Sequence, residues 1–399
     1  MSMKTHTRKK TDNDRRSGRG GGLRSLVSSS AGFSLVELLF VLVIFSLVMA
    51  ALYQSFNAQV KMGIMREYRV AESEMELGIV RGIIERDLAM TGYALSDNVD
   101  SASGLSLVAP LNGTDGGAGA PDTLLLRGTA VGRGTRAAQG WTYAEDQSPT
   151  FFVWDDAREN LVPGSTVIIM DPTIKRLKSM GTDWMFRYTG PNTSPTTLGG
   201  SPFNTGLQQG DVIYGFYGDP SAATPVQPYY SVRYSLGGTS PGGCAQGTLS
   251  LLRVESRTDA LPVGGDPIMN CVLDMEVVLG RDTNEDSIID QWDNGAAAFT
   301  TGAATAEAAL VMDPSSDLMR NLNRSLKQIR MYILVQDGSR EQNYTYSNPD
   351  PAASNPAVIR VGDLSLPGGA AGRDVTLTAE QRRYRWRVVM VTESPRNIE

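Results

Sequence analysis

A long apolar run near the N-terminus limits what this chain can be more than any other feature. Every residue from Leu35 to Tyr53 is apolar except Glu37 and Ser46. As a helix, these 19 residues would extend about 28 Å at ~1.5 Å of rise per residue, which matches the ~30 Å hydrocarbon core of a bilayer. We therefore expect residues 33–56 to form a helix that spans a membrane.

Charge is divided unevenly around this run. Residues 1–32 carry eight lysines and arginines and two aspartates, so this leader has a net charge of +6, whereas the whole chain has −6. Positive charge on the N-terminal flank predicts that this end stays in the cytoplasm and that the acidic remainder crosses the membrane. An acidic body also argues against direct binding of nucleic acid.

The residues just before the apolar run predict a cleavage site. A secretory signal peptide has its small residues after the apolar stretch, but here Ala31 and Gly32 come before it. Cleavage after Gly32 would remove residues 1–32, keep the helix on the mature protein and create a free amine on Phe33. The carboxylate of Glu37, which costs roughly 2.5–3.5 kcal/mol in a membrane, would then need a partner, and the amine of a neighbouring subunit would supply one.

The segment from Gly32 to Leu39 resembles the leader motif of type IV prepilins and type II secretion pseudopilins, with Gly before the cut, Phe after it and Glu at mature position five. The resemblance implies that a prepilin peptidase cuts between Gly32 and Phe33 and methylates the Phe33 amine. It also implies that Glu37 acts in assembly and that the 33–56 helix packs in a filament core.

The same resemblance implies a location and a set of partners. The chain would be a single-pass precursor in the inner membrane and would later join a pilus filament, with its body in the periplasm or outside the cell. Its partners would be the prepilin peptidase, other minor and major pilins and the inner-membrane assembly platform, and they could include a tip adhesin.

Enzyme chemistry has few residues to work with in this sequence. The histidine, His6, lies in the leader, and the two cysteines are Cys244 and Cys271. The mature chain would therefore lack a Ser-His-Asp triad, a Cys-His pair, and any His-ligated or four-cysteine metal site. Paired acids such as Asp155 and Asp156 are not gathered by a catalytic motif, so we expect a protein that is not an enzyme.

The helix is expected to continue past the membrane as an amphipathic extension over 57–93. The sequence has no proline before Pro110, and apolar residues recur at three- and four-residue steps, which is typical of a helix with a buried side. Two neighbouring stripes form one broad apolar face that should pack on a globular body. The first stripe is Tyr68, Ala71, Met75, Ile79, Gly82, Ile83, Arg86 and Met90, and the second is Leu77, Val80, Ile84 and Leu88.

Two further segments, one at the end of this helix and one near the end of the chain, resemble a particular group of pilins. Met75–Tyr93 and Tyr384–Val389 are similar to PilW-type minor pilins. The leading interpretation is a PilW-like minor pilin in the initiating or tip complex of a type IV pilus, where a large body suits a low-copy position. Two alternatives stay open: a minor pseudopilin of the J type in a type II secretion system, and a calcium-dependent adhesin at a pilus tip.

Residues 94–399 have the pattern of a β-rich globular body, which could form two lobes with a boundary near 220–230. Strand patterns follow one another with no helix between most of them, which favours an antiparallel sheet and an α+β fold. The expected strands are Asp122–Arg127, Thr166–Met170, Asp211–Phe216, Tyr229–Leu236, Thr248–Val254, Val272–Leu279, Ile329–Val335 and Arg385–Val391. The expected loops, rich in Gly, Pro, Ser and Thr, are 111–121, 189–210, 237–247, 294–309 and 345–358.

An acidic loop over 282–293 carries the strongest metal-binding pattern in the body. Oxygen-bearing side chains fall at positions 1, 3, 5, 9 and 12 of this 12-residue loop, with a backbone carbonyl at position 7, which is the EF-hand spacing for calcium. Ser287 replaces the glycine of the sharp turn and Asp293 replaces the bidentate glutamate, so the site should be weak. The alternative is a solvated acidic turn held by Asx hydrogen bonds. The expected ligands are Asp282, Asn284, Asp286, Ile288, Asp290 and Asp293.

Cys244 and Cys271 lie 27 residues apart in the globular body, which is expected in the periplasm or outside the cell. In an oxidising compartment a disulfide between them would stabilise the fold by roughly 3–4 kcal/mol on the loop-entropy model. Two unpaired thiols are the alternative, because only geometry decides whether the pair can be bridged. Either state would be structural.

Overall fold

The structure is a computed structural model of the 399-residue chain. It forms two compact units, Met1–Met65 and Arg66–Glu399, which we describe separately. Gly32 and Phe33 lie outside the residues that the structure describes. The described residues are 34–99, 105, 110–114, 116, 119–132, 140–145, 150–203, 206–215, 229–256, 264–282, 284, 286–294, 325–341, 343–349, 355–363, 366 and 371–395.

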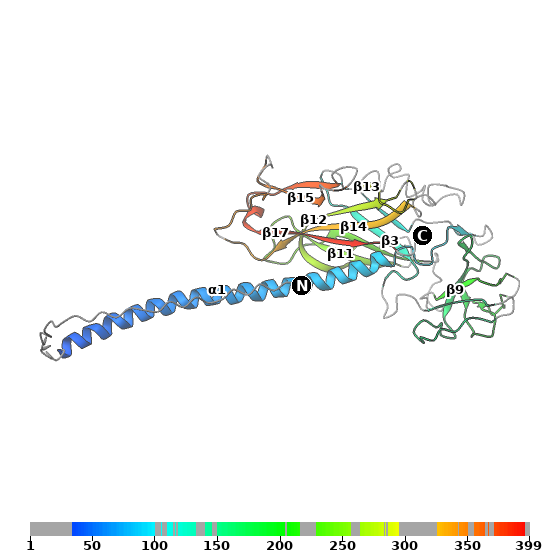
Figure 1. The fold of residues 1–399 in the computed structure, drawn as a ribbon, viewed down its shortest axis with the longest axis horizontal. Coiled ribbons are helices and arrows are strands. Elements are labelled where there is room, and N and C mark those ends of the chain that lie inside the picture. Colours follow the sequence, from blue (N-terminus) through cyan, green and yellow to red (C-terminus); the bar gives the residue numbers. More distant parts are fainter. Residues whose placement is uncertain are drawn as a thin grey trace, which may run out of the picture. The chain divides into compact units, whose positions relative to one another are not determined.

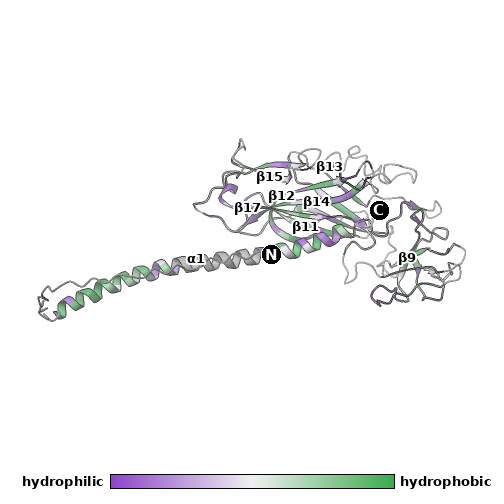
Figure 2. Ribbon diagram, viewed as in Figure 1, coloured by the Kyte–Doolittle hydropathy of each residue, from purple (hydrophilic) through white to green (hydrophobic). Residues whose placement is uncertain are grey.

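A long helix, α1 (Leu35–Ala89), begins in the first unit and ends in the second (Figure 1). Its segment Leu35–Asn57 is long and apolar enough to cross a membrane, and none of that segment is buried in the structure. Figure 2 shows this first part of the helix mostly in the colour of hydrophobic residues. An uninterrupted helix of this length is consistent with the absence of proline, which would remove a backbone donor and break the helix.

The helix ends where the chain turns onto a sheet. After Ala89, Gly92 has a φ of 78°, a left-handed conformation that glycine adopts without steric cost. The Gly92 N–H donates a hydrogen bond to the carbonyl of Arg127 at 2.8 Å, and Arg127 belongs to strand β3 (Thr123–Gly128). The helix therefore stops short of the expected end at residue 93.

A large antiparallel sheet forms the main core of the second unit (Figure 1). Its strand order is β17–β14–β12–β11–β10–β3–β2, and β13 also pairs with β12. With the helix before it, this sheet confirms the expected α+β fold. The further strands are β2 (Leu111–Thr114), β10 (Tyr230–Gly237), β11 (Leu249–Ser256), β12 (Asp266–Arg281), β13 (Gln291–Asn294), β14 (Leu326–Asp337) and β17 (Arg385–Glu393).

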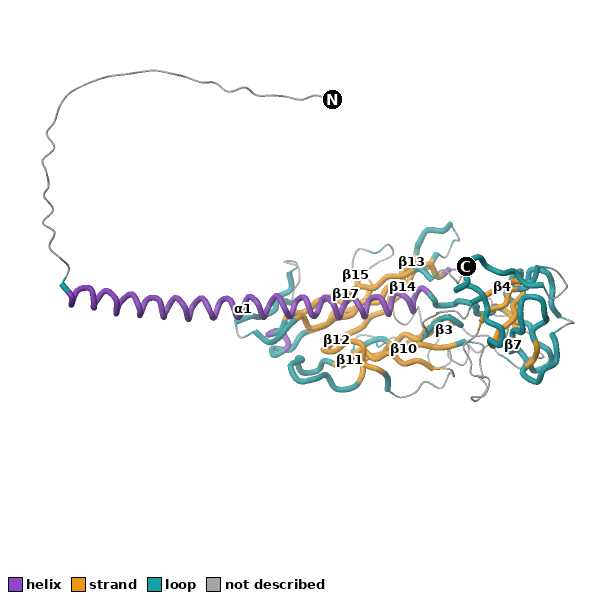
Figure 3. The backbone as a smooth tube through the Cα atoms, turned by 90° about the horizontal axis from the view of Figure 1, so that it is seen from below, coloured by secondary structure: helices purple, strands orange, loops and turns teal. Residues whose placement is uncertain are grey.

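Both faces of the large sheet are covered, which explains the continuous apolar runs in its central strands. Met331 and Ile333 of β14 belong to the core that also contains the last turns of α1, and Figure 3 shows these turns lying along the strands. Leu334 points to the opposite face and packs with the hairpin of β15 (Val358–Asp363) and β16 (Ala371–Thr376). Strands buried on both faces have no need for alternating polar residues.

Only one of the two expected helix stripes is buried. Val80, Ile84 and Leu88 are between 0% and 3% exposed in the core of the large sheet. By contrast, Met75 and Ile79 of the first stripe are 70% and 61% exposed, so the expectation of one broad buried face is wrong at these positions. The physical reason is that a helix lying on a sheet buries one side of its circumference. The second stripe lies on that side, and of the first stripe Met90 is partly buried against the same core.

A second, smaller sheet is formed mainly by the chain between β3 and β10. Its first strand, β1, comes earlier in the sequence, before β3. Its strand order is β1–β6–β5–β7–β8, and β9 joins β5 to β4. It has its own core around Val167, Ile169 and Phe186, and the chain returns to the large sheet at Tyr230, next to the expected lobe boundary. Its strands are β1 (Asn98–Val99), β4 (Trp141–Tyr143), β5 (Thr166–Asp171), β6 (Arg176–Leu177), β7 (Phe186–Arg187), β8 (Thr196–Thr197) and β9 (Val212–Gly215).

Several strands differ from those expected. β4, β15 and β16 lie outside the strands expected from the sequence, and β2 and β8 lie at positions expected to be loops. These strands are short or pair at the edge of a sheet, so their own apolar pattern is weak and the partner strand supplies the stabilisation. β12 is also longer at both ends than the expected Val272–Leu279, because β11 and β13 pair with its two ends.

A buried ionic cluster attaches the end of α1 to the large sheet. The Asp87 carboxylate, which is 2% exposed, accepts hydrogen bonds from the Tyr234 hydroxyl and from Nε of Arg253, both at 2.6 Å. Burial, and then the charge of Asp87, raise the pKa of the Tyr234 hydroxyl. Burial lowers the pKa of the Arg253 guanidinium, but the hydrogen bond and charge of Asp87 outweigh this effect and raise the pKa. The ion pair between Asp87 and Arg253 therefore adds to the apolar packing of the helix on the sheet.

Asp87→Ala is expected to lower the free energy of unfolding by about 1–3 kcal/mol, because the buried Tyr234 hydroxyl would lose its acceptor and the half-buried Arg253 would be left with Glu255 as its carboxylate partner. Asp156→Ala is the control, since it breaks the exposed pair with Arg158, and such pairs contribute about 0.2–1 kcal/mol. Urea unfolding followed by circular dichroism measures both variants. Equal losses of stability would contradict the role of the buried cluster.

Candidate functional site

The first turn of α1 is one candidate site, and Glu37 is the charged residue of the segment 35–57. The Leu38 N–H donates to the carbonyl of Ser34 at 3.1 Å, which begins the helix just before Glu37. A carboxylate in a first turn is favoured by the helix dipole by about 0.3–1 kcal/mol. Because Phe33 lies outside the described residues, the cleavage, the methylation and the pairing of Glu37 with an amine stay predictions.

The surface around Glu37 is apolar and exposed. Leu35, Phe40 and Leu47 are 79%, 67% and 66% exposed in the structure. Burying a side chain of this size is worth about 1.5–3 kcal/mol, so a helix with such a surface on all sides is stable only when something covers it. The arrangement suits insertion into a bilayer and packing against other apolar helices rather than chemistry.

The acidic loop is the turn of a β-hairpin. β12 and β13 are antiparallel partners, with Arg281 opposite Gln291. The N–H of Asp290 donates to the carbonyl of Arg281 at 3.0 Å and closes the loop. The apolar strand before the loop pairs in the sheet, and the polar residues of the turn have side-chain oxygens that can accept backbone N–H groups. The loop is thus flanked by strands, unlike the loop of an EF-hand.

Side-chain oxygens of the loop accept hydrogen bonds from its own backbone. The buried carboxylate of Asp282 accepts from the N–H groups of Asp286 at 3.2 Å and Ser287 at 2.8 Å. Oδ1 of Asn284 also accepts from the Asp286 N–H, at 3.1 Å, and Oδ1 of Asp286 accepts from the Ile288 N–H at 2.8 Å. Ser287 has a φ of 70°, the left-handed conformation for which the calcium loop normally uses glycine.

The expected calcium ligands are only partly brought together. Asp282, Asn284, Asp286 and the backbone of Ile288 share one turn, whereas Asp293 lies in β13 with its backbone opposite Leu279. Within the part of the chain that the structure describes, no three His, Cys, Asp or Glu side chains are grouped to hold a metal ion. The hydrogen bonds suit a solvated turn as well as a calcium loop, so calcium binding stays a prediction.

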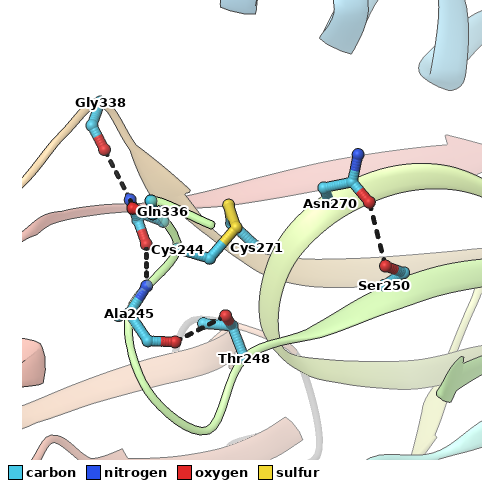
Figure 4. Close-up of a disulfide and its surroundings, with 9 residues drawn as sticks. Cys244, Ala245, Thr248, Ser250, Asn270, Cys271, Gln336 and Gly338 are labelled. Atoms are coloured by element: carbon cyan, nitrogen blue, oxygen red, sulfur yellow. Dashed lines mark hydrogen bonds between the residues drawn. A yellow bond between two sulfur atoms is a disulfide. The ribbon is translucent and has the colours of Figure 1, made fainter. Parts of the chain in front are cut away.

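Cys244 and Cys271 are joined by a disulfide in the structure, with their Cα atoms 5.1 Å apart (Figure 4). This separation is ordinary for a disulfide. The Gln336 side chain of β14 holds the same loop: its Oε1 accepts from the Ala245 N–H at 2.6 Å, and its Nε2 donates to the Gly243 carbonyl at 3.2 Å. The disulfide therefore links the loop between β10 and β11 to β12, which is a structural role.

Four aromatic side chains that were not expected to form a site lie together on the small sheet. Trp141 and Tyr143 lie in β4, and Phe152 and Trp154 lie in the segment that pairs beside it. The ring centroids are 4.3 Å apart for the two tryptophans and 5.0 Å apart for Tyr143 and Phe152. In both segments the two aromatics are separated by one residue, and this period-two spacing could have revealed a shared face.

Residues 27–53 match the family model described as the prokaryotic N-terminal methylation motif. Among solved structures, the chain is similar to a type IV-like pilin from Thermus thermophilus, with a TM-score of 0.32 and 10% sequence identity over 82% of this chain and 98% of that chain. No curated protein matches the chain. The motif includes the Gly32–Phe33 junction, Glu37 and the apolar run, and it supports a membrane-anchored precursor of the pilin or pseudopilin type.

Proposed function

We propose that this protein is a PilW-like minor pilin of a type IV pilus, which enters the initiating or tip complex of the filament through its N-terminal helix. One observation carries the proposal: the methylation motif over residues 27–53 includes the first part of α1, from Leu35 onward, whose apolar side chains are exposed. The leader comes first, then the cleavage point, then the apolar helix. A prepilin peptidase would remove the leader at this point, and the helix would then be free to enter a filament.

Two environments in turn would satisfy the exposed surface of Leu35–Asn57. In the bilayer, lipid tails cover the apolar side chains, but the Glu37 carboxylate costs roughly 2.5–3.5 kcal/mol. In a filament, neighbouring helices cover the same side chains, and the amine that cleavage creates on a neighbour's Phe33 neutralises the carboxylate. Glu37 therefore favours the filament over the membrane, which gives assembly its direction.

The size of the body supports a place at one end of the filament. The unit Arg66–Glu399 contains the large sheet, the small sheet and the β15–β16 hairpin. Subunits of a filament shaft pack in large numbers around one axis, and a body of this size would hinder that packing. A minor pseudopilin of the J type would use the same helix, and the genes beside this one would distinguish the two roles.

Cleavage between Gly32 and Phe33 is the first test of the proposal. The N-terminal peptide of the mature protein should begin with N-methylated Phe33, as measured by mass spectrometry of the membrane fraction. Gly32→Glu should leave the leader attached, because a bulky charged side chain should not fit a peptidase pocket that accepts a small residue. Ala31→Ser is the control and should be processed normally. A mature chain that starts at another residue would refute the assignment.

Glu37→Val should insert into the membrane at least as well as the natural chain but enter filaments poorly. The change removes a carboxylate that costs roughly 2.5–3.5 kcal/mol in the bilayer, and with it the partner of the neighbour's amine. Ser46→Val is the matched control, because it also replaces a polar residue of the apolar run but removes no charge. Immunoblots of membranes and of sheared filaments measure the two steps, and equal filament levels for both variants would count against the role of Glu37.

We also propose that the acidic loop binds one calcium ion, which orders the loop and does no chemistry. The ligands would be the oxygens of Asp282, Asn284, Asp286, Ile288, Asp290 and Asp293. Support comes from their spacing and from the left-handed Ser287 at the turn position. The carboxylates repel one another, so a divalent cation would relieve that repulsion and stabilise the folded state by mass action.

Calcium at about 10 mM is expected to raise the melting temperature of the full chain by a few degrees, given an affinity in the ~10⁻⁴–10⁻³ M range of extracellular sites. Asp286→Asn should remove most of this shift, because it keeps an oxygen acceptor for the Ile288 N–H but loses the charge. Asp171→Asn is the matched control, since Oδ1 of Asp171 accepts from the Thr173 N–H in the same type of turn. An unchanged melting temperature between calcium and chelator would identify the loop as a solvated turn.

A further inference from the structure

We propose that Trp141, Tyr143, Phe152 and Trp154, which we call the aromatic platform, form a binding site for a neutral glycan on the small sheet. The inference does not depend on the assembly role of the N-terminal helix, because the site lies wholly on the inserted sheet. It follows from the exposure, the rigidity and the polar surroundings of these rings.

Hydrogen bonds between two adjacent segments build the aromatic platform. The Phe152 N–H donates to the Tyr143 carbonyl at 3.0 Å, and the Thr142 hydroxyl donates to the Phe152 carbonyl at 2.6 Å. The rings of Tyr143 and Phe152 then stack with an angle of 13° between their planes, and Phe152 meets Trp154 edge to face at 4.7 Å. Offset-stacked and edge-to-face arrangements are the geometries that aromatic pairs prefer, so the rings stabilise one another.

The aromatic platform lies outside the core of the small sheet. Thr142, Ala144 and Phe151 are buried, whereas all members of the platform are half-buried. Alternate residues of a strand point to opposite faces, so Trp141 and Tyr143 lie on the face of β4 opposite its core. None of the four rings belongs to the hydrophobic clusters formed by the buried residues that the structure describes.

Hydrogen bonds hold Trp154 in place before any ligand arrives. Its indole Nε1 donates to the carbonyl of Trp141 at 2.8 Å. Its backbone N–H donates to Oδ1 of Asn160, and Nδ2 of Asn160 donates back to the Trp154 carbonyl, both at 2.8 Å. A side chain that is already ordered loses little conformational entropy on binding. The site is therefore pre-organised.

Exposed acidic residues lie close to the four aromatic residues along the chain. Glu145 follows Tyr143 by two residues, Asp155 is next to Trp154, and the Glu159 carbonyl accepts from the Trp141 N–H at 3.0 Å. Carboxylates accept hydrogen bonds from hydroxyl groups. The faces of aromatic rings carry negative charge density, which attracts the polarised C–H groups on the apolar side of a sugar ring. A neutral sugar offers both of these groups.

Other ligand classes fit the site less well. The exposed acids Glu145, Asp155 and Glu159 outnumber the exposed Arg158, which pairs with Asp156. The net negative charge disfavours phosphates, nucleic acids and anionic sugars. A quaternary ammonium ion needs a cage with space between its rings, but the rings of Trp141 and Trp154 are in contact. A protein partner typically covers about 800 Å², whereas four half-buried rings, each of ~150–250 Å², expose much less than this.

Titration of the full chain with neutral oligosaccharides tests the proposal. The protein is purified in a polyoxyethylene detergent, whose headgroup contains neither sugar nor ammonium. The probes are oligosaccharides of glucose, of galactose and of N-acetylglucosamine, and the readout is the tryptophan fluorescence. We expect a saturable change with at least one series. Trp154→Ala should weaken the affinity by about tenfold or more, equivalent to about 1.4 kcal/mol.

Two further variants separate binding from folding. Phe152→Leu keeps an apolar side chain but removes the ring, and it should also weaken the affinity by about tenfold. Trp386→Ala is the matched control, because its indole Nε1 likewise donates to a backbone carbonyl, that of Gln381, at 2.8 Å, and it should leave the affinity unchanged. The proposal is overturned if no neutral series gives saturable binding, if the platform variants bind as well as the natural chain, or if only choline or sialylated sugars bind.

Discussion

Attachment of the last turns of α1 to the large sheet is the interaction on which the rest of the second unit depends. Val80, Ile84 and Leu88 supply the apolar contact, and the bond of Asp87 to Arg253 limits how the helix can rotate, since a buried charge needs its partner in a narrow range of geometry. Without the helix, one face of β12 and β14 would be in water, although these strands are apolar on both faces.

The same helix meets two opposing requirements along its length. Near its end, one side is buried on the sheet and the other is exposed, while Leu35–Asn57 is apolar around its whole circumference and unburied. A helix that is apolar all round is stable only in a membrane or inside an assembly. This division within one element, rather than a catalytic group, suits the chain to anchoring and assembly.

The small sheet adds a surface without disturbing that attachment. The chain leaves the large sheet after β3 and returns in β10, and these two strands pair with each other, so the insertion begins and ends at neighbouring points. The rings of Tyr93 and Tyr214, 5.4 Å apart, connect the end of the helix to the small sheet. Because the small sheet has a core of its own, the outer face of β4 is available for the aromatic platform.

The sequence by itself determined the features that depend on residues close together: the apolar run, the position of Glu37 after Gly32, the antiparallel strands and the spacing of the acidic loop. Tertiary structure alone decided which helix stripe is buried, since the stripes of Ile79 and Val80 have the same period and similar apolarity. It also decided the insertion of the small sheet and the meeting of Asp87 with Tyr234, 147 residues later. Such contacts depend on where distant segments pack, and a local pattern contains no information about that.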